Sequence, residues 1–209
     1  MALLATYNVY RQASRELMNK VTKASLSRDA IDRSAKLLGI TRGGVLVFDS
    51  EEEMTVLFDF AINDYRVRGK NAIELYAETK KPANEVEREI LAGFSSAHTS
   101  LFRVTSVSRS DNTVVLRDLL DDGDDVQLTD VNLSKTAERG FLLFLRVVPL
   151  RDFRMTSGFM FAFAGSLEGR LLAGYKRPAK KAESLAEAQR RFVHFFKAHK
   201  AHGVEVRYG

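Results

Sequence analysis

The period of the hydrophobic pattern changes near Ser100, and this change constrains the fold more than any other feature of the sequence. Before it, apolar residues recur at spacings of three, four and seven, which is the period of an amphipathic helix. After it, apolar and polar residues alternate in short runs rich in Val, Leu and Phe, which is the period of a strand. Because helices and strands are segregated along the chain, we predict an α+β fold.

Residues 1–99 are predicted to form a helical region. Ser27 is expected to be the N-cap of a short helix that ends at Gly39, since glycine accepts the left-handed conformation of a helix C-cap. The tetrad Ser50-Glu51-Glu52-Glu53 fits a capping box and predicts the start of the next long helix. Pro82 is expected in the first turn of a further helix, where its missing amide costs nothing.

Residues 100–165 are predicted to form a small antiparallel β-structure. Five short strands fit within about 65 residues, and Asp111-Asn112 favours a tight hairpin turn between two of them. Such spacing leaves no room for helical crossovers. We therefore expect a meander closed into a barrel or a strongly curled sheet, of SH3-like or OB-like size, on which the helical half packs. The pattern does not choose between the two barrel types.

Residues 166–209 are predicted to form a basic linker and a C-terminal amphipathic helix. Three glycines loosen the chain before the linker at 176–181, and Ser184-Leu185-Ala186-Glu187 is a second capping-box pattern. The helix that follows carries an apolar stripe that includes Phe192, Phe195 and Phe196, and residues 204–208 suit one last short strand. The three regions could share one core.

The net charge of +5 is concentrated at one end of the chain. Residues 1–99 carry 14 basic and 14 acidic side chains, residues 100–165 carry 8 and 9, and residues 166–209 carry 10 and 4. A local excess of positive charge is typical of a surface that faces a polyanion. No base-reading motif accompanies it, so we expect a non-catalytic binding or regulatory protein that contacts nucleic acid or another polyanion without base specificity. The candidate residues are Lys176, Arg177, Lys180, Lys181, Arg190, Arg191, Lys197 and Lys200.

Two other classes of function stay open at this point. The chain has 14 phenylalanines and 6 tyrosines, and if several of these are exposed, a subunit that assembles with a protein partner becomes the better hypothesis. An enzyme of unrecognised class would need a pocket in the β region. The charged residues that could line such a pocket are Arg103, Asp118, Arg146 and Arg154.

Several kinds of chemistry have no signature in the sequence. No cysteine is present, which excludes disulfides, thiolate metal sites and cysteine nucleophiles. The Walker A pattern, the dinucleotide glycine fingerprint and the nucleophile elbow are all missing, and we expect no cofactor. The acidic run 121–125 does not fit a calcium loop, because the twelfth position counted from Asp121 is Asn132. His199 and His202 could join Glu205 around a metal, but the positive charge nearby opposes a divalent cation, so we expect no metal site.

The sequence also carries signals about location. The longest apolar runs are far shorter than the roughly 18 residues of a spanning helix, and the first ten residues lack the pattern of a secretory signal. A chain without cysteine is expected in the cytoplasm by default.

A short segment of the β region has a partial resemblance to a known motif. Asn132-Leu133-Ser134 resembles the start of the Asn/Asp-x-Ser-x-x-Gly element of PilZ domains, small barrels that bind cyclic di-GMP. Ala137 stands where that element has glycine. The Arg-x-x-x-Arg pair of that family is missing nearby, since Arg11 and Arg15 lie more than a hundred residues upstream. We therefore assign no family from the sequence.

Overall fold

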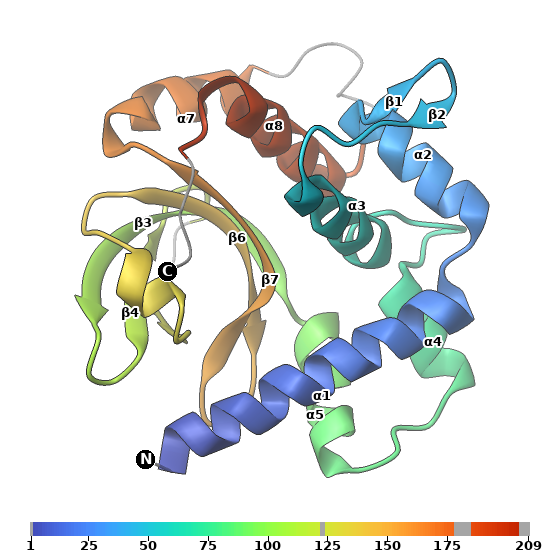
Figure 1. Cartoon of the computed structure of the whole chain (residues 1–209), viewed down its shortest axis with the longest axis horizontal. Helices are drawn as coiled ribbons and strands as arrows, with labels where there is room; N and C mark the ends of the chain where they lie inside the picture. The colour runs from blue at the N-terminus through green and yellow to red at the C-terminus, as the bar shows by residue number, and fades with distance from the viewer. Residues whose placement is uncertain (1, 122–123, 178–184, 205–209) are drawn as a thin grey trace. The chain divides into compact units, whose positions relative to one another are not determined.

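The computed structural model describes residues 2–121, 124–177 and 185–204 (Figure 1). The chain divides into two compact units. The first, which we call the helical unit, comprises Met1–Ala97 and Val148–Arg151. The second, which we call the sheet unit, comprises His98–Val147 and Asp152–Gly209.

The helical unit forms where the sequence has the 3.6-residue period. Its described elements are α1 (Ala2–Ser25), α2 (Arg28–Leu38), the hairpin β1 (Thr41–Arg42) and β2 (Val45–Leu46), α3 (Glu51–Asn63), α4 (Ala72–Thr79) and α5 (Glu85–Ser95). The predicted caps of α2 are confirmed. The side chain of Ser27 accepts a hydrogen bond from the Ala30 amide (3.2 Å), and Gly39 adopts the left-handed conformation with φ 81°.

Two predicted helix starts differ in detail from the structure. Helix α3 begins at Glu51 as expected, but the Ser50 side chain makes no capping bond. The Glu53 carboxylate accepts a hydrogen bond from the amide of Asp49 (2.8 Å). Pro82 is not in the first turn of α5. The helix begins three residues later, because the Asn84 side chain accepts from an amide in the first turn and supplies the cap.

The segment 148–151 packs against α5 inside the helical unit. Gly93 is the contact point: a Cβ atom there would lie 2.5 Å from the carbonyl oxygen of Pro149. Next to it, the Glu89 carboxylate accepts hydrogen bonds from the Arg151 amide (2.6 Å) and from the Tyr10 hydroxyl (2.7 Å). The absence of a side chain at Gly93 therefore allows two backbones to approach closely.

Five strands form the sheet of the second unit, in the order β5-β4-β3-β6-β7. Their bounds are β3 (His98–Ser108), β4 (Thr113–Asp118), β5 (Val126–Thr129), β6 (Leu142–Pro149) and β7 (Arg154–Phe163). The pairs β3–β4, β3–β6 and β4–β5 are antiparallel, and the predicted turn at Asp111-Asn112 joins β3 to β4. The prediction of an α+β fold with an antiparallel sheet is confirmed.

The prediction of a closed barrel is wrong for the part of the chain that the structure describes. Strands β5 and β7 lie at the two ends of the strand order and are not paired with each other. They do approach one another, since the Thr156 hydroxyl of β7 donates to the carboxylate of Asp130, just after β5 (3.1 Å). The sheet therefore curves without its ladder closing.

Helix α8 (Glu187–His202) confirms the predicted C-terminal helix, and its phenylalanines pack on the sheet. The Phe195 ring stacks on Phe144 of β6 with centroids 4.6 Å apart, and Phe192 lies 4.8 Å from Phe159 of β7. Phe196 is also buried. The predicted capping residue Ser184 and most of the predicted strand 204–208 lie outside the described residues.

Three shorter elements of the sheet unit were not predicted. They are α6 (Leu133–Thr136), the 3-10 turn η1 (Gly165–Leu167) and α7 (Glu168–Lys176). The sequence interpretation gave residues 165–176 as loosened chain and the start of a linker, but Leu171 is buried and Tyr175 lies against α8. Packing of these two side chains outweighs the low helix propensity of the glycines around them.

Candidate polyanion-binding surface

Helices α7 and α8 lie side by side in the sheet unit and carry most of the predicted binding residues (Figure 1). The Tyr175 ring of α7 lies 5.7 Å from the rings of both His194 and Phe195 of α8. A Cβ atom at Gly174 would be 3.2 Å from the His194 ring. The last turn of α7 therefore rests on the middle of α8, and the charged residues of both helices belong to one surface.

The two acidic side chains of this helix pair are both engaged by arginines. Glu168 of α7 accepts from Arg103 of β3, whose Nε lies 2.9 Å from Oε2 of the carboxylate. Glu187 of α8 accepts from Arg191 one turn along the same helix (3.2 Å). Helices α7 and α8, together with Arg177 directly after α7, carry seven lysines and arginines and these two acids, so a large positive excess is left on the pair.

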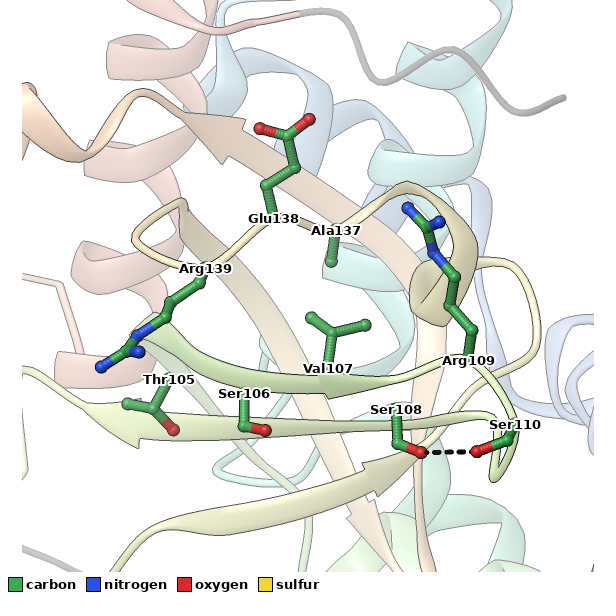
Figure 2. A pocket seen from close by; sticks show the side chains of 9 residues that line it. All are labelled: Thr105, Ser106, Val107, Ser108, Arg109, Ser110, Ala137, Glu138 and Arg139. Atoms are coloured by element: carbon green, nitrogen blue, oxygen red, sulfur yellow. Dashed lines mark hydrogen bonds between the residues drawn. The ribbon is translucent and has the colours of Figure 1, made fainter.

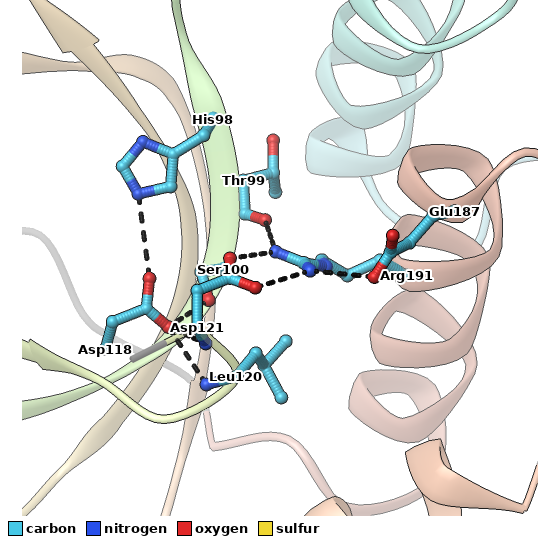
Figure 3. A network of polar contacts seen from close by, with 8 residues as sticks. All are labelled: His98, Thr99, Ser100, Asp118, Leu120, Asp121, Glu187 and Arg191. Atoms are coloured by element: carbon cyan, nitrogen blue, oxygen red, sulfur yellow. Dashed lines mark hydrogen bonds and ion pairs between the residues drawn. The ribbon is translucent and has the colours of Figure 1, made fainter. Parts of the chain in front are cut away.

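Arg191 has its partners inside the protein (Figure 3). Its residue is only 8% exposed, and its guanidinium donates to both carboxylate oxygens of Asp121 (2.7 and 3.0 Å) and to the carbonyl oxygen of Thr99 (2.9 Å). Burial disfavours the charged form, but the hydrogen bonds to Asp121 and the negative charge of its carboxylate hold the pKa of Arg191 above its ordinary value. Arg191 therefore fastens α8 to the sheet and does not contribute to an open cationic surface.

The other predicted cations of the pair are exposed or half-buried. Lys176, Arg177 and Lys197 are exposed and make no ion pair with any described residue. The Arg190 guanidinium lies over the Tyr175 ring, 5.3 Å from its centroid. Tyr175 directly precedes Lys176 and Arg177 in the chain. Because Arg190 and Lys197 are seven residues apart, they lie on one face of α8 about 10 Å apart along its axis.

The remaining cations of this region are Arg170, Lys200, Lys180 and Lys181. Arg170 of α7 is exposed and forms no ion pair with any residue that the structure describes, and the sequence analysis did not select it because α7 itself was missed. The Lys200 ammonium lies over the Phe196 ring at 5.7 Å. Lys180 and Lys181 lie outside the described residues. We define the α7–α8 cationic surface as Arg170, Lys176, Arg177, Arg190 and Lys197.

The four charged residues proposed to line a pocket in the β region do not meet at one place. Arg103 pairs with Glu168. Arg146 of β6 is buried, with its guanidinium over the Phe159 ring (5.8 Å), and Arg154 is exposed at the start of β7. Asp118 is buried at the end of β4. A hollow in the sheet unit, between residues 105–110 and 137–139, is lined by none of the four (Figure 2).

Asp118 is the centre of a hydrogen-bond network that resembles a catalytic group only in composition (Figure 3). Its carboxylate accepts from the Ser100 hydroxyl and from the amides of Leu120 (2.9 Å) and Asp121 (3.1 Å), and His98 Nε2 lies 3.6 Å away. Burial raises the pKa of Asp118, but these donors outweigh burial and the pKa is lowered. Ser100 bonds to the carboxylate and not to the imidazole, so the serine–histidine–aspartate order of a catalytic triad is not formed.

Comparison with known proteins gives one match. The model of a family described as "Family of unknown function (DUF7986)" matches residues 1–209. The chain belongs to the DUF7986 family. No curated protein and no solved structure matches the chain.

The histidines considered as metal ligands in the sequence have other neighbours in this DUF7986 chain. Within 2–121, 124–177 and 185–204, no three His, Asp or Glu side chains converge as a metal site would require. His199 instead packs between aromatic rings, 5.0 Å from Phe161 and 5.7 Å from Phe163, while Glu205 lies outside the described residues. In the same ranges, no helix has both the length and the apolar character that crossing a bilayer requires.

Proposed function

We propose that the chain binds nucleic acid through the α7–α8 cationic surface, by contact with the phosphate backbone and without base specificity. The observation that supports this proposal is that both acidic side chains of α7 and α8 are already paired with arginines. Glu168 pairs with Arg103 of β3, and Glu187 pairs with the buried Arg191, so these two acids do not neutralise the other cations of the two helices. Five cations are left with no carboxylate partner among the described residues; four of them are exposed, and Arg190 is half-buried.

Backbone contact without base reading follows from where the aromatic rings lie. Proteins that stack bases on aromatic side chains need exposed rings next to the cations. On α8, Phe192, Phe195 and Phe196 are all at most 2% exposed, because they form the core against β6 and β7. The cations therefore act on phosphates alone, and the affinity must depend strongly on salt.

The test is a titration of a fluorescently labelled single-stranded oligonucleotide at 50 and 200 mM salt. Five phosphate contacts correspond to a slope of log K against log salt of about −3.5, or an affinity loss of about 100-fold between the two salt concentrations. The double variant Arg170→Gln with Lys197→Gln leaves three contacts and a slope of about −2, so the same change in salt weakens it only about 20-fold.

A charge-matched control separates this surface from net charge. The double variant Lys135→Gln with Arg154→Gln removes two exposed cations elsewhere on the sheet unit, and we expect the wild-type slope from it. A slope that falls equally in both double variants, or no binding at 50 mM salt, would contradict the proposal.

Assembly with a protein partner is a second candidate, and the apolar surface of the helical unit supports it. Val45 is 65% exposed and Met54 50%, with Leu46 and Phe48 exposed beside Val45 in the chain. Contiguous exposed apolar side chains are typical of interfaces. Light scattering tests this reading for self-assembly: a wild-type mass above 23.5 kDa that returns to the monomer value in Val45→Asp supports it, and a monomeric wild type argues against it.

A further inference from the structure

The β1–β2 hairpin of the helical unit is shaped by its own turn (Figure 1). The two residues between its strands, Gly43 and Gly44, have φ of 59° and 81°. Positive φ at both positions makes this a type I′ turn, whose twist matches that of the two strands it joins. The hairpin is therefore a local feature that the sequence specifies within a few residues.

Residues 45–48 of this hairpin form an apolar segment that is largely exposed. All four are Val, Leu or Phe, and Val and Phe favour strands. Val45 is 65% exposed, and Leu46 and Phe48 are each 37% exposed. A run of exposed apolar side chains is typical of a surface that contacts another molecule.

The outer edge of β2 carries backbone groups that β1 does not use. In an antiparallel pair of strands, hydrogen-bonded and non-hydrogen-bonded residue pairs alternate. The Val47 amide donates to the Ile40 carbonyl oxygen (3.1 Å), so the next pair along, Thr41 with Leu46, is of the non-hydrogen-bonded kind. The N–H and C=O groups of Leu46 therefore point away from β1. Among the described residues, β1 and β2 form a sheet of two strands, so no third strand pairs with this edge.

The same alternation fixes how this edge can pair with a copy of itself. Beyond Leu46, the next residue with outward backbone groups is Phe48, because Val47 is hydrogen-bonded towards β1. Antiparallel pairing of two copies therefore sets Leu46 of one copy opposite Phe48 of the other, and Val47 opposite Val47 on a two-fold axis. Alternate side chains share a face, so Leu46 and Phe48 of both copies come together as one apolar cluster.

The charges at the ends of the segment fit the antiparallel register. Arg42 is paired with Val45 in the hairpin, and Val45 would lie opposite Asp49 of the second copy. These residues share one cross-strand row, with about 10 Å between the Cα atoms of Arg42 and that Asp49. Within one copy the Arg42 guanidinium bonds to Asp49 (3.1 Å), so both side chains lie on one face of the hairpin. Parallel pairing would instead set two Asp49 carboxylates side by side, so charge favours the antiparallel arrangement.

We infer that the edge of β2 binds β2 of a second copy of this chain, so that the two hairpins form one continuous antiparallel sheet centred on Val47. This inference rests on the assembly candidate above and specifies its occupant and its register. The exposed apolar side chains are few compared with the area of about 800 Å² that each partner buries in a standard interface. We therefore expect a weak dimer, with a Kd of about 10–100 µM.

Disulfide cross-linking tests the register, because the chain contains no cysteine and each variant then carries a single thiol. Opposite residues of a non-hydrogen-bonded pair have Cα atoms about 4.5 Å apart, which a disulfide spans. With oxidised glutathione as the oxidant, we expect Val47→Cys to form a linked dimer about tenfold faster than Val45→Cys, because only Val47 faces its own copy. Random collisions predict the reverse order, since Val45 is the more exposed of the two.

Two lysine variants separate this pairing from non-specific association. Leu46→Lys places a charge opposite Phe48 of the second copy, so it should weaken the dimer about tenfold or more in sedimentation equilibrium and remove the fast cross-linking of Val47→Cys. Val9→Lys changes an apolar side chain of α1 that is 56% exposed, and both measurements should stay unchanged. Equal urea midpoints will show that the variants fold.

Each outcome supports the inference or overturns it. A chain that stays monomeric at about 500 µM, well above the expected Kd, overturns both this pairing and the self-assembly candidate. A dimer in which Val45→Cys cross-links as fast as Val47→Cys, or which Leu46→Lys leaves intact, overturns the pairing while self-assembly stands. Fast cross-linking of Val47→Cys that Leu46→Lys abolishes and Val9→Lys preserves supports the pairing. None of these measurements uses nucleic acid, so they decide the pairing independently of the proposed phosphate binding.

Discussion

Replacement of Arg191 by methionine tests whether a buried ion pair, and not the phenylalanine core alone, fixes α8 on the sheet. Methionine keeps a long apolar stem and removes the four hydrogen bonds of the guanidinium, two to Asp121 and one each to Thr99 and Glu187. The substitution therefore isolates the polar contribution.

The expected loss follows from what each partner can do without the arginine. The Thr99 residue is 7% exposed, so its carbonyl oxygen loses a charged donor that water replaces poorly, at a cost of about 1–2 kcal/mol. The Asp121 and Glu187 side chains are 53% and 66% exposed, so water can solvate them, and each pair adds at most about 0.5 kcal/mol. We expect a loss of about 2 kcal/mol, which is less than the roughly 3–5 kcal/mol lost when a fully buried ion pair is broken.

Arg190→Met is the matched control, because the same change is made one residue away. Its guanidinium contacts the Tyr175 ring and no carboxylate among the described residues, so we expect a loss below about 1 kcal/mol. Urea unfolding followed by circular dichroism gives the free energies. Hydrogen exchange should show faster exchange of the α8 amides in Arg191→Met, with those of α1 unchanged. Equal losses in the two variants, or equal acceleration in α1, would refute the reasoning.

Three further predictions concern single side chains. Burial lowers the pKa of His194 below its ordinary value of 6.5, so the folded state binds a proton less readily than the unfolded state, and the stability of the sheet unit should fall as the pH drops below 6.5. Urea midpoints measured at pH 7 and pH 5 will show this dependence. We expect His194→Gln to remove it and His202→Gln to leave it unchanged. The pKa of Asp118 is lowered from 3.8, so Asp118→Asn should cost about 1–2 kcal/mol at pH 7, and urea midpoints should converge with those of wild type below pH 3.8 as the carboxyl becomes protonated. Gly93→Ala should destabilise the helical unit by about 1–3 kcal/mol in urea unfolding because its Cβ meets the Pro149 carbonyl, whereas Gly169→Ala in α7, with no neighbour within 4 Å, should stabilise the chain by about 0.5–1 kcal/mol.

The local rules of helix and turn formation account for what the sequence predicted well. The change of period near Ser100 falls two residues from the start of β3 at His98, and the caps at Ser27 and Gly39 are where propensity places them. Both kinds of signal depend on neighbours within a few residues. The barrel prediction failed because strand count and spacing do not determine whether edge strands pair. Closure depends on stagger between strands, which the hydrophobic pattern does not encode.

The candidate surface could be predicted only in part, because its geometry depends on contacts far apart in the sequence. The charge excess of residues 166–209 is visible from composition. The partners that decide which charges are exposed are not, since Arg103 reaches Glu168 across 65 residues and Arg191 reaches Asp121 across 70. Arg170 was not selected from the sequence because the glycines of α7 reduce helix propensity and no helix was predicted there. In the structure, the packing of Tyr175 against α8 stabilises the helix.

The different environments of Arg190 and Arg191 limit the number of phosphate contacts that the α7–α8 cationic surface can make. Consecutive residues of a helix point about 100° apart, so Arg191 enters the space against the sheet while Arg190 lies over Tyr175. Of the seven lysines and arginines on α7, α8 and the residue directly after α7, the surface retains five without a carboxylate partner among the described residues. Five contacts limit the salt slope on duplex DNA to about −4.5. A steeper measured slope would require cations from outside this surface and would show that the α7–α8 pair is only part of the binding site.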